Sequence, residues 1–180
     1  SGVGSASLDA LTVENSLLFV QQGGRKVREL VYSLEADGYQ TRDVSLLSDH
    51  LLAAGIVDWT VQRSTAFHVW CVLGDGSAVC MTLNREQNVA AWHAHRLEHG
   101  RILSVASLRG CHGSPDEEVW FAVARGEGER ACITVERLAD GNVCLDACTE
   151  AVVQGEKMAG LGHLAGCGAL LLDGEGACLP

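Results

Sequence analysis

The feature that most constrains the fold is an internal repeat of about 50 residues. A bulky apolar pair recurs along the chain, and its second member is aromatic each time, at Phe19, Trp70 and Trp120. After each pair come a short strand-like run, a turn containing glycine and a returning strand. A repeat of this length with three or four strands per unit is typical of β-propeller blades.

The second and third units are the most alike. The return strand Cys80–Leu83 reads CMTL, and its counterpart Cys132–Val135 reads CITV. A single blade cannot bury both faces of its small sheet, so blades stack side by side. We expect the three aromatic residues, here called the repeat anchors, to fill the space between adjacent sheets. An ordinary β-sandwich with coincidental spacing is the alternative.

The sequence therefore predicts an all-β, mainly antiparallel fold with three β-propeller-like blades and one short helix. The helix is expected at Leu46–Ala54, with Ser45 or Asp43 as its N-cap and Gly55 at its end. Three units are too few to close a propeller ring, which typically has four to eight blades. We expect either a fragment of a larger propeller or an open or oligomeric arrangement.

Composition and turn signals divide the chain into three parts. Residues 1–14 are rich in Ser, Gly and Ala and are expected to form a flexible N-terminal segment. Residues 15–140 carry the repeat and form the blade-repeat β domain. Residues 141–180 do not follow the repeat and are expected to form a small C-terminal β segment that includes a strand at Val143–Asp146.

The charge of the chain argues against nucleic acid as a partner. The formal net charge is −10, and the one basic cluster, Arg25, Lys26 and Arg28, lies beside Glu29. A polyanion-binding surface needs clustered Lys and Arg to displace counterions from phosphate. No apolar run approaches the roughly 18 residues that span a bilayer, so no membrane partner is expected.

The 8 cysteines contain no C-x-x-C pair. Several, such as Cys80 and Cys132, stand where a strand would place a small apolar side chain. Free, buried cysteines are the expected state. A disulfide from Cys144 to Cys148, which would need a tight turn, is the alternative.

Candidate chemical sites are few. His93 and His95 would share a face of a strand near His99, which suggests a metal site, but only Glu98 is a nearby carboxylate. Cys111 and His112 are adjacent in a glycine-rich loop, where neighbouring side chains rarely face each other. The carboxylates Glu117 and Glu118 neighbour a turn and are expected to be solvated. No serine-hydrolase elbow or phosphate-binding loop is present. We therefore expect no catalytic, cofactor or metal site, and no enzymatic activity.

The same segments resemble a known family. The run Leu18–Leu30, the Asp43–Ile56 region, Val69–Val72, and Val119–Trp120 with Glu136–Leu138 are similar to segments of tail and virion structural proteins of tailed phages and prophages. The resemblance covers roughly residues 15–175 and includes Gly160–Gly166 and Leu170–Gly174. Gly162 and Ala165 stand where that family usually has acidic residues. Family members usually run well beyond a chain of this length.

The resemblance implies a propeller-containing tail nozzle, hub or tube-associated component. Expected partners are other virion or tail subunits and further copies of the chain, as a homo-oligomer. The expected location is the virion, after synthesis in the bacterial cytoplasm from a phage or prophage gene. The alternative is a receptor-binding or glycan-binding module, which needs exposed aromatic rings at Trp59, Trp92 or Tyr39. A polymer-digesting hydrolase is disfavoured because no convergent acid pair is present.

Overall fold

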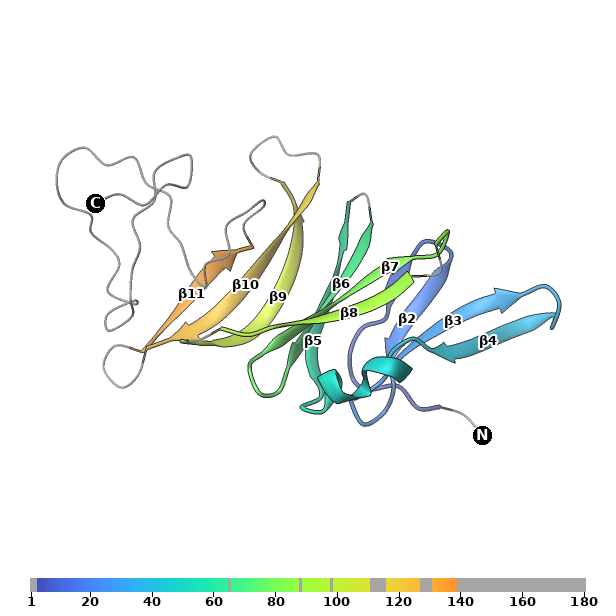
Figure 1. Cartoon of the computed structure of the whole chain (residues 1–180), viewed down its shortest axis with the longest axis horizontal. Coiled ribbons are helices and arrows are strands. Elements are labelled where there is room, and N and C mark those ends of the chain that lie inside the picture. The colour runs from blue at the N-terminus through green and yellow to red at the C-terminus, as the bar shows by residue number, and fades with distance from the viewer. Residues whose placement is uncertain are drawn as a thin grey trace.

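The computed structural model describes residues 3–64, 66–87, 89–97, 99–110, 116–126 and 131–138 (Figure 1). The described chain is almost entirely β-structure, with one short helix between the fourth and fifth strands. The strands are β1 (Leu11–Val13), β2 (Ser16–Val20), β3 (Val27–Ser33), β4 (Gly38–Asp43), β5 (Ile56–Arg63), β6 (Phe67–Leu73), β7 (Ala78–Asn84), β8 (Val89–His95), β9 (Arg101–Arg109), β10 (Glu117–Arg125) and β11 (Cys132–Arg137). The all-β prediction is confirmed.

Consecutive strands pair into three antiparallel sheets. Sheet 1 has the order β1-β2-β3-β4, sheet 2 the order β5-β6-β7-β8, and sheet 3 the order β9-β10-β11 within the described residues. The three sheets follow one another from one end of the molecule to the other, with sheet 2 in the middle (Figure 1). Each sheet is one unit of the sequence repeat, and each repeat anchor lies on the second strand of its sheet.

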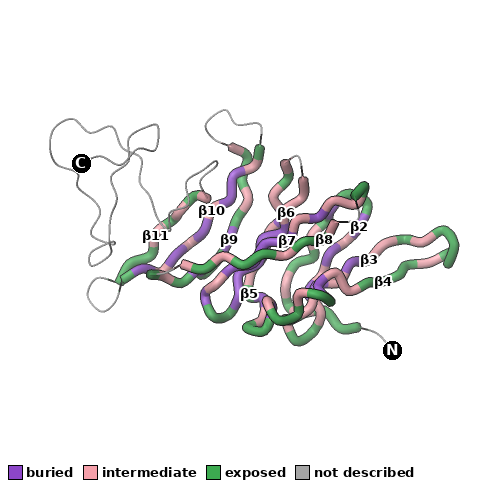
Figure 2. The backbone as a smooth tube through the Cα atoms, in the orientation of Figure 1, coloured by how far each residue is buried: buried purple, intermediate pink, exposed green. Residues whose placement is uncertain are grey.

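Sheet 2 lies between the other two sheets and is packed on both of its faces. Among the described residues, sheets 1 and 3 are each packed against another sheet on one face only. In β6 every residue from Val69 to Leu73 is buried, which is visible at the centre of Figure 2. Val69, Cys71 and Leu73 belong to the core shared with sheet 1, while Trp70 and Val72 belong to the core shared with sheet 3. A strand buried on both faces reads as a continuous apolar run, which explains the sequence VWCVL.

A repeated hydrogen bond joins each sheet to the next. The Ile56 amide, at the start of β5, donates to the carbonyl of Gly24 at 2.7 Å, and the Ile102 amide in β9 donates to Gly76 at 2.9 Å. Both glycines lie in the turn between the second and third strands of the preceding sheet. Both have positive φ, 75° and 85°. This backbone conformation favours glycine, because the Cβ atom of other residues makes it sterically unfavourable.

A further bond links the first strands of sheets 2 and 3, which lie side by side. Asp58 stands at an irregularity in the pairing of β5, and its carboxylate accepts the Val105 amide of β9 at 2.9 Å. A backbone donor that would otherwise be unpaired between two sheets is thereby satisfied. These bonds fix how sheet 3 is placed on sheet 2.

The helix η1 (Leu46–Leu52) is a 3₁₀ helix interrupted by non-helical geometry at Ser48. It lies where the sequence predicts a short helix. Ser45 precedes it but makes no capping bond; its hydroxyl instead donates to Asp43 at 2.8 Å and accepts the Val27 amide at 3.1 Å. Gly55 has φ of 78°, as expected for the residue that ends the segment.

The expected domain boundary at residue 15 is too late. Leu11–Val13 form β1, which pairs with β2, and Val13 is fully buried. Ser5 also makes an isolated bridge with Gln21. This part of the chain therefore belongs to sheet 1 and is not a separate flexible segment. The expected C-terminal segment 141–180, with its strand at Val143–Asp146, lies outside the described residues.

Candidate functional site

The repeat anchors do not occupy equivalent places. Trp70 is 4% exposed and packs between sheets 2 and 3, where its ring meets Phe121 edge to face with centroids 5.7 Å apart. Phe19 and Trp120 are half-buried and belong to neither of the two cores. Of the three anchors, only Trp70 fills a space between two described sheets.

The strand faces explain this difference. In β10, Val119, Phe121 and Val123 face sheet 2, so the alternating residue Trp120 lies on the opposite, outer face of sheet 3. In β2, Leu18 and Val20 face sheet 2, which places Phe19 on the outer face of sheet 1. The two anchors therefore lie on the two end faces of the stack.

The polar end of Trp70 is part of a bridge between sheets. Its indole Nε1 donates to Gln62 Oε1 at 3.0 Å, and the side-chain Nε2 of Gln62 donates to the backbone carbonyl of Glu117 at 2.7 Å. The Glu117 carboxylate in turn accepts the Arg63 amide at 2.7 Å and the Ser107 hydroxyl at 2.9 Å. This network secures β5 to the start of β10.

The expectation that Glu117 and Glu118 are solvated is wrong. Glu117 is half-buried in the bridge, and Glu118 is 5% exposed. Glu118 Oε1 lies 3.6 Å from Arg137, while its Oε2 is buried and has no hydrogen-bond partner within the described residues. The two side chains point to opposite faces of β10, which does not suit an acid pair acting on one substrate.

A buried carboxylate that the sequence did not reveal lies at the junction of sheets 1 and 2. Glu29 in β3 is fully buried and forms ion pairs with Arg42 of β4 and Arg85 of the β7–β8 turn. Its Oε1 also accepts the Ser16 hydroxyl at 2.9 Å, and Arg85 lies 3.0 Å from Glu14. A buried charge is tolerated only when it is paired and hydrogen-bonded, as it is here.

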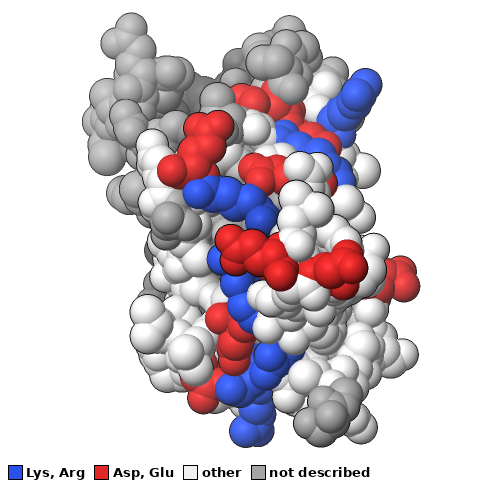
Figure 3. Space-filling view, turned by 90° about the vertical axis from the view of Figure 1, so that its right-hand side faces the viewer, with Lys and Arg blue, Asp and Glu red and all other residues white. Residues whose placement is uncertain are grey.

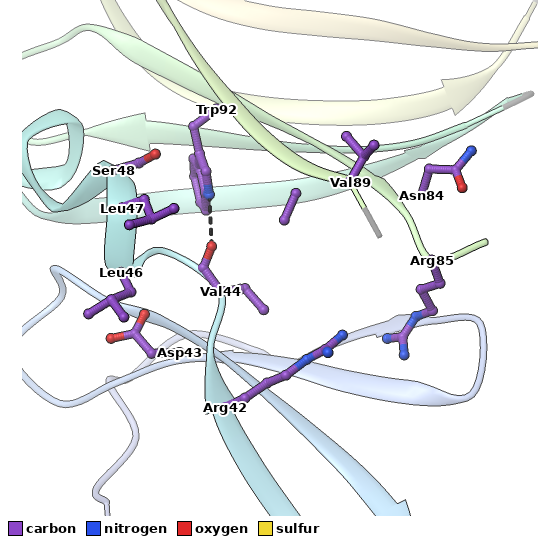
Figure 4. A pocket seen from close by; sticks show the side chains of 11 residues that line it. Arg42, Asp43, Val44, Leu46, Leu47, Ser48, Asn84, Arg85, Val89 and Trp92 are labelled. Atoms are coloured by element: carbon purple, nitrogen blue, oxygen red, sulfur yellow. Dashed lines mark hydrogen bonds between the residues drawn. The ribbon is translucent and has the colours of Figure 1, made fainter. Parts of the chain in front are cut away.

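The same arginines line a pocket of about 310 Å³ (Figure 4). Arg42 and Arg85 point toward one another from its two sides, and Trp92 forms part of its wall. The Trp92 indole donates to the Val44 carbonyl at 3.0 Å, which fixes the ring. The lining residues are Arg42, Asp43, Val44, Leu46, Leu47, Ser48, Asn84, Arg85, Val89, Ala90 and Trp92.

The charge of this pocket is largely compensated. Glu29 and Glu14 neutralise the two guanidinium groups, so their attraction for a free anion is weak. Leu46 and Leu47 on the rim are 65% and 93% exposed. An open wall of exposed leucine is better suited to contact with another protein surface than to enclosing a small molecule.

The histidines form a cluster on the face of sheet 2 that carries Trp70. The rings of His93 and His95 are 4.8 Å apart, and His95 also lies 4.8 Å from Trp70. Burial lowers the pKa of His68 and of His95, and the nearby His93 lowers both further; a hydrogen bond with Ala66 partly opposes this at His68. In the described part of the chain, no group of three or more His, Cys, Asp or Glu side chains is arranged to hold a metal ion.

The cysteines that the structure describes are free. Cys71 and Cys80 are buried in sheet 2, as expected, whereas Cys132 is exposed on β11. Burial raises the pKa of the Cys71 thiol far above its usual value and that of Cys80 to about 12. Neither thiol is available as a thiolate nucleophile. Cys111, His112, Cys144 and Cys148 lie outside the described residues.

The aromatic residues required by glycan binding are differently placed. Trp59 is 6% exposed and donates to the Asp9 carbonyl at 2.8 Å, and Trp92 is fixed in the pocket wall. Tyr39 is 74% exposed and stacks edge to face on Tyr32 at the end of the β3–β4 hairpin. Of the three expected rings, Trp59 is thus buried, Trp92 is half-buried in the pocket wall, and Tyr39 is exposed.

Basic and acidic side chains alternate on the end of the molecule formed by sheet 1 (Figure 3). Lys26 is paired with Asp43 at 3.2 Å, and Arg28 donates to Gln21 at 2.7 Å. The basic cluster is thus divided among local partners. Within the described residues, no helix is long and apolar enough to cross a bilayer.

A scan against protein-family models found no match, and a search of curated proteins found none either.

Proposed function

We propose that the chain is a structural subunit that works through protein–protein contacts, and that its setting is the tail of a phage or prophage virion. The tail setting comes from the resemblance of its sequence segments. The structural role is supported by the architecture, in which the buried side chains form two cores between adjacent sheets and backbone bonds join each described sheet to the next. No catalytic step forms part of this proposal.

We further propose that the three sheets are successive propeller blades. The observation that carries this is the repeated bond from the first strand of each following sheet, at Ile56 and Ile102, to a glycine carbonyl of the preceding sheet. The same bond at two successive steps implies a similar placement of each sheet on the last. β5 and β9 would then be inner strands beside a common axis, with β8 on the outside.

Protein contacts are favoured over glycan binding by the placement of the aromatic rings. Trp59 and Trp70 are buried, so their faces cannot stack on a sugar. The exposed apolar side chains are instead spread over the end faces of the stack and the helix rim. Such surfaces are typical of contacts between subunits.

The setting is tested by mass spectrometry of tail particles purified from lysates of cells that carry the gene. We expect the chain to be present in a fixed ratio to the other tail proteins, and its deletion to give particles with defective tails. Absence of the chain from particles that are complete and infective would contradict the tail role.

A further inference from the structure

The outer face of sheet 3 is an apolar surface with nothing packed on it among the described residues. On β11, Ile133 and Val135 are 67% and 71% exposed, and they pair with Ala124 and Ala122 on the face that carries Trp120. On β9, Leu108 on the same face is 51% exposed. Contiguous exposed apolar residues on one sheet face indicate an interaction site.

Trp120 occupies the position in sheet 3 that corresponds to Trp70 in sheet 2. Both stand on the second strand, and both point to the face directed toward the next sheet in the series. Trp70 meets Phe121 of that next sheet and has its indole satisfied by Gln62. Gln62 lies opposite His68, the residue two positions before Trp70. In sheet 3 the residue opposite the corresponding position, Glu118, is Leu108, so an apolar side chain stands where sheet 2 has Gln62.

This substitution leaves two buried polar atoms without partners on the outer face. Trp120 Nε1 has no acceptor, and Glu118 Oε2 has no donor, within the described residues. An unpaired buried polar group destabilises the protein, so such groups normally have partners in the functional state. The outer face therefore combines exposed apolar side chains with two buried polar atoms that have no partner within the described residues.

The opposite end of the molecule carries aromatic and apolar side chains among the charged ones of Figure 3. On the outer face of sheet 1, Phe19 lies with Leu17 and Leu30, and Tyr32 and Tyr39 are 46% and 74% exposed. Arg28 lies on the same face and carries the kind of cationic donor that Glu118 Oε2 lacks.

We propose that the outer face of sheet 3 binds the outer face of sheet 1 of a second copy of this chain. Phe19 of the second copy would pack near Trp120, as Phe121 packs on Trp70 inside one chain. The contact continues the series of sheet-on-sheet interfaces already present in the molecule. It is a heterologous contact, which gives a closed ring when its rotation fits and an open fibre when it does not.

The ring size follows from the number of sheets. Two copies supply six sheets, which is within the four to eight blades of known propellers, whereas three copies supply nine. We therefore expect a dimer with two equivalent contacts. The dimer rests on the proposed propeller arrangement, whereas the contact itself rests on the two end faces.

The first test is light scattering coupled to size-exclusion chromatography of the full chain over a range of concentrations. We expect twice the mass of one chain. Val135→Glu on sheet 3 and Tyr39→Glu on sheet 1 should each weaken the dimer at least about tenfold, because each places a charge in the contact. Ala53→Glu is the matched control, since Ala53 is exposed, directly follows the helix, and belongs to neither end sheet nor the pocket lining.

Circular dichroism and the unfolding midpoint show whether each variant is folded, and both substituted residues are exposed in the single chain. A wild-type chain that stays monomeric at every accessible concentration would overturn the inference. So would a dimer that resists both end-face substitutions, because another surface would then form it.

The second test asks what covers β11. A photo-cross-linking amino acid at position 135, in a mixture of light and heavy isotope-labelled copies, should give cross-links between copies to residues of sheet 1. Cross-links confined to one copy and directed to residues 139–180 would overturn the proposal. A monomer that still enters tail particles refutes this contact alone, whereas a dimer that never enters them refutes the proposed function alone.

Discussion

Trp70 of β6 and Phe121 of β10 meet edge to face, with ring centroids 5.7 Å apart, across the boundary between sheets 2 and 3. This geometry is preferred for aromatic pairs because the positive ring edge faces the negative ring face. The two residues come from strands about 50 positions apart in the chain. Their contact is the centre of the core that attaches sheet 3 to the rest of the molecule.

Phe121→Ala should destabilise the protein by about 3–5 kcal/mol, through lost burial and the cavity left against Trp70. Urea unfolding followed by circular dichroism measures this. Leu34→Ala is the control, because Leu34 is 86% exposed in the β3–β4 turn and its loss should cost no more than about 0.5 kcal/mol. Equal effects of the two substitutions would mean that the Phe121 contact contributes little.

Glu29→Gln should destabilise the protein by about 3 kcal/mol or more, because it removes the charge that compensates Arg42 and Arg85 and leaves them inadequately paired. Glu14→Gln, which affects only the partly exposed pair with Arg85, should cost about 1 kcal/mol or less. Chemical unfolding of the two variants under the same conditions compares them. A larger effect at Glu14 would show that the buried carboxylate is not the main partner.

Gly76→Ala should be more damaging than Gly23→Ala. Both glycines have positive φ, so both substitutions incur strain of about 1–2 kcal/mol. At Gly76 the new methyl group would also lie 2.8 Å from the Arg101 side chain, whereas at Gly23 nothing lies within 4 Å. Thermal unfolding should therefore show a clearly lower midpoint for Gly76→Ala, and equal midpoints would contradict a close approach of sheet 3 to this turn.

Stability should fall as the pH is lowered from 7.5 to 5.5. The pKa values of His68 and His95 are lowered in the folded protein, mainly by burial, so each ring takes up a proton less readily there than in the unfolded chain. Unfolding then binds protons, and lower pH favours the unfolded state. Urea unfolding at several pH values measures the slope.

The histidine assignment has a matched control. The double substitution His68→Gln and His95→Gln should flatten the slope of stability against pH, whereas Leu34→Ala, which removes no titratable group, should leave it unchanged. An unchanged slope in the double variant would place the titrating groups elsewhere.

Cys132 should react with iodoacetamide in the folded protein, and Cys71 and Cys80 should not. Cys132 is exposed, while the other two are buried and the pKa of Cys80 is raised to about 12, so thiolate is scarce there. Peptide mapping by mass spectrometry assigns the modified positions. In denaturant all three should react, and rapid labelling of Cys80 in the folded state would contradict its burial.

Local signals in the sequence were sufficient to predict most strands and the single helix. The run from Val69 to Leu73, the Gly74–Gly76 turn and the return from Ala78 are short-range patterns, and they correspond closely to β6 and β7. β1 escaped prediction because Leu11–Val13 alternates over only three residues, too few to distinguish a strand from the Ser-, Gly- and Ala-rich stretch before it. Its place in the sheet is fixed by pairing with β2 and by the burial of Val13.

The spacing of the repeat anchors in the sequence could not predict which face of its sheet each anchor occupies. Residues at equal spacing can still point to opposite faces, because a shift of one position in a strand turns a side chain over. Sheet 1 has one described neighbouring sheet, so Leu18 faces that neighbour and Phe19 faces away. In sheet 2 the corresponding residue, Trp70, faces the next sheet.

The Glu29 network was likewise invisible in the sequence. A charged residue in an alternating strand is usually exposed, and nothing local distinguishes Glu29 from Glu35. Its partner Arg85 lies in another sheet, so the pairing depends on how the two sheets pack. The pocket beside it depends on the same packing.

Because each sheet in the described part of the chain is built from consecutive strands, each can form while the chain is still being synthesised. Strand partners such as β6 and β7 are separated by short turns, which keeps the entropy lost on loop closure small and favours fast folding. Sheet 1 can be complete before sheet 2 has left the ribosome. Its buried-face residues Leu18 and Val20 then form an apolar surface on which sheet 2 can pack. Glu29 gains its Arg85 partner only when sheet 2 has formed, so the junction of the first two sheets is completed after sheet 1 itself.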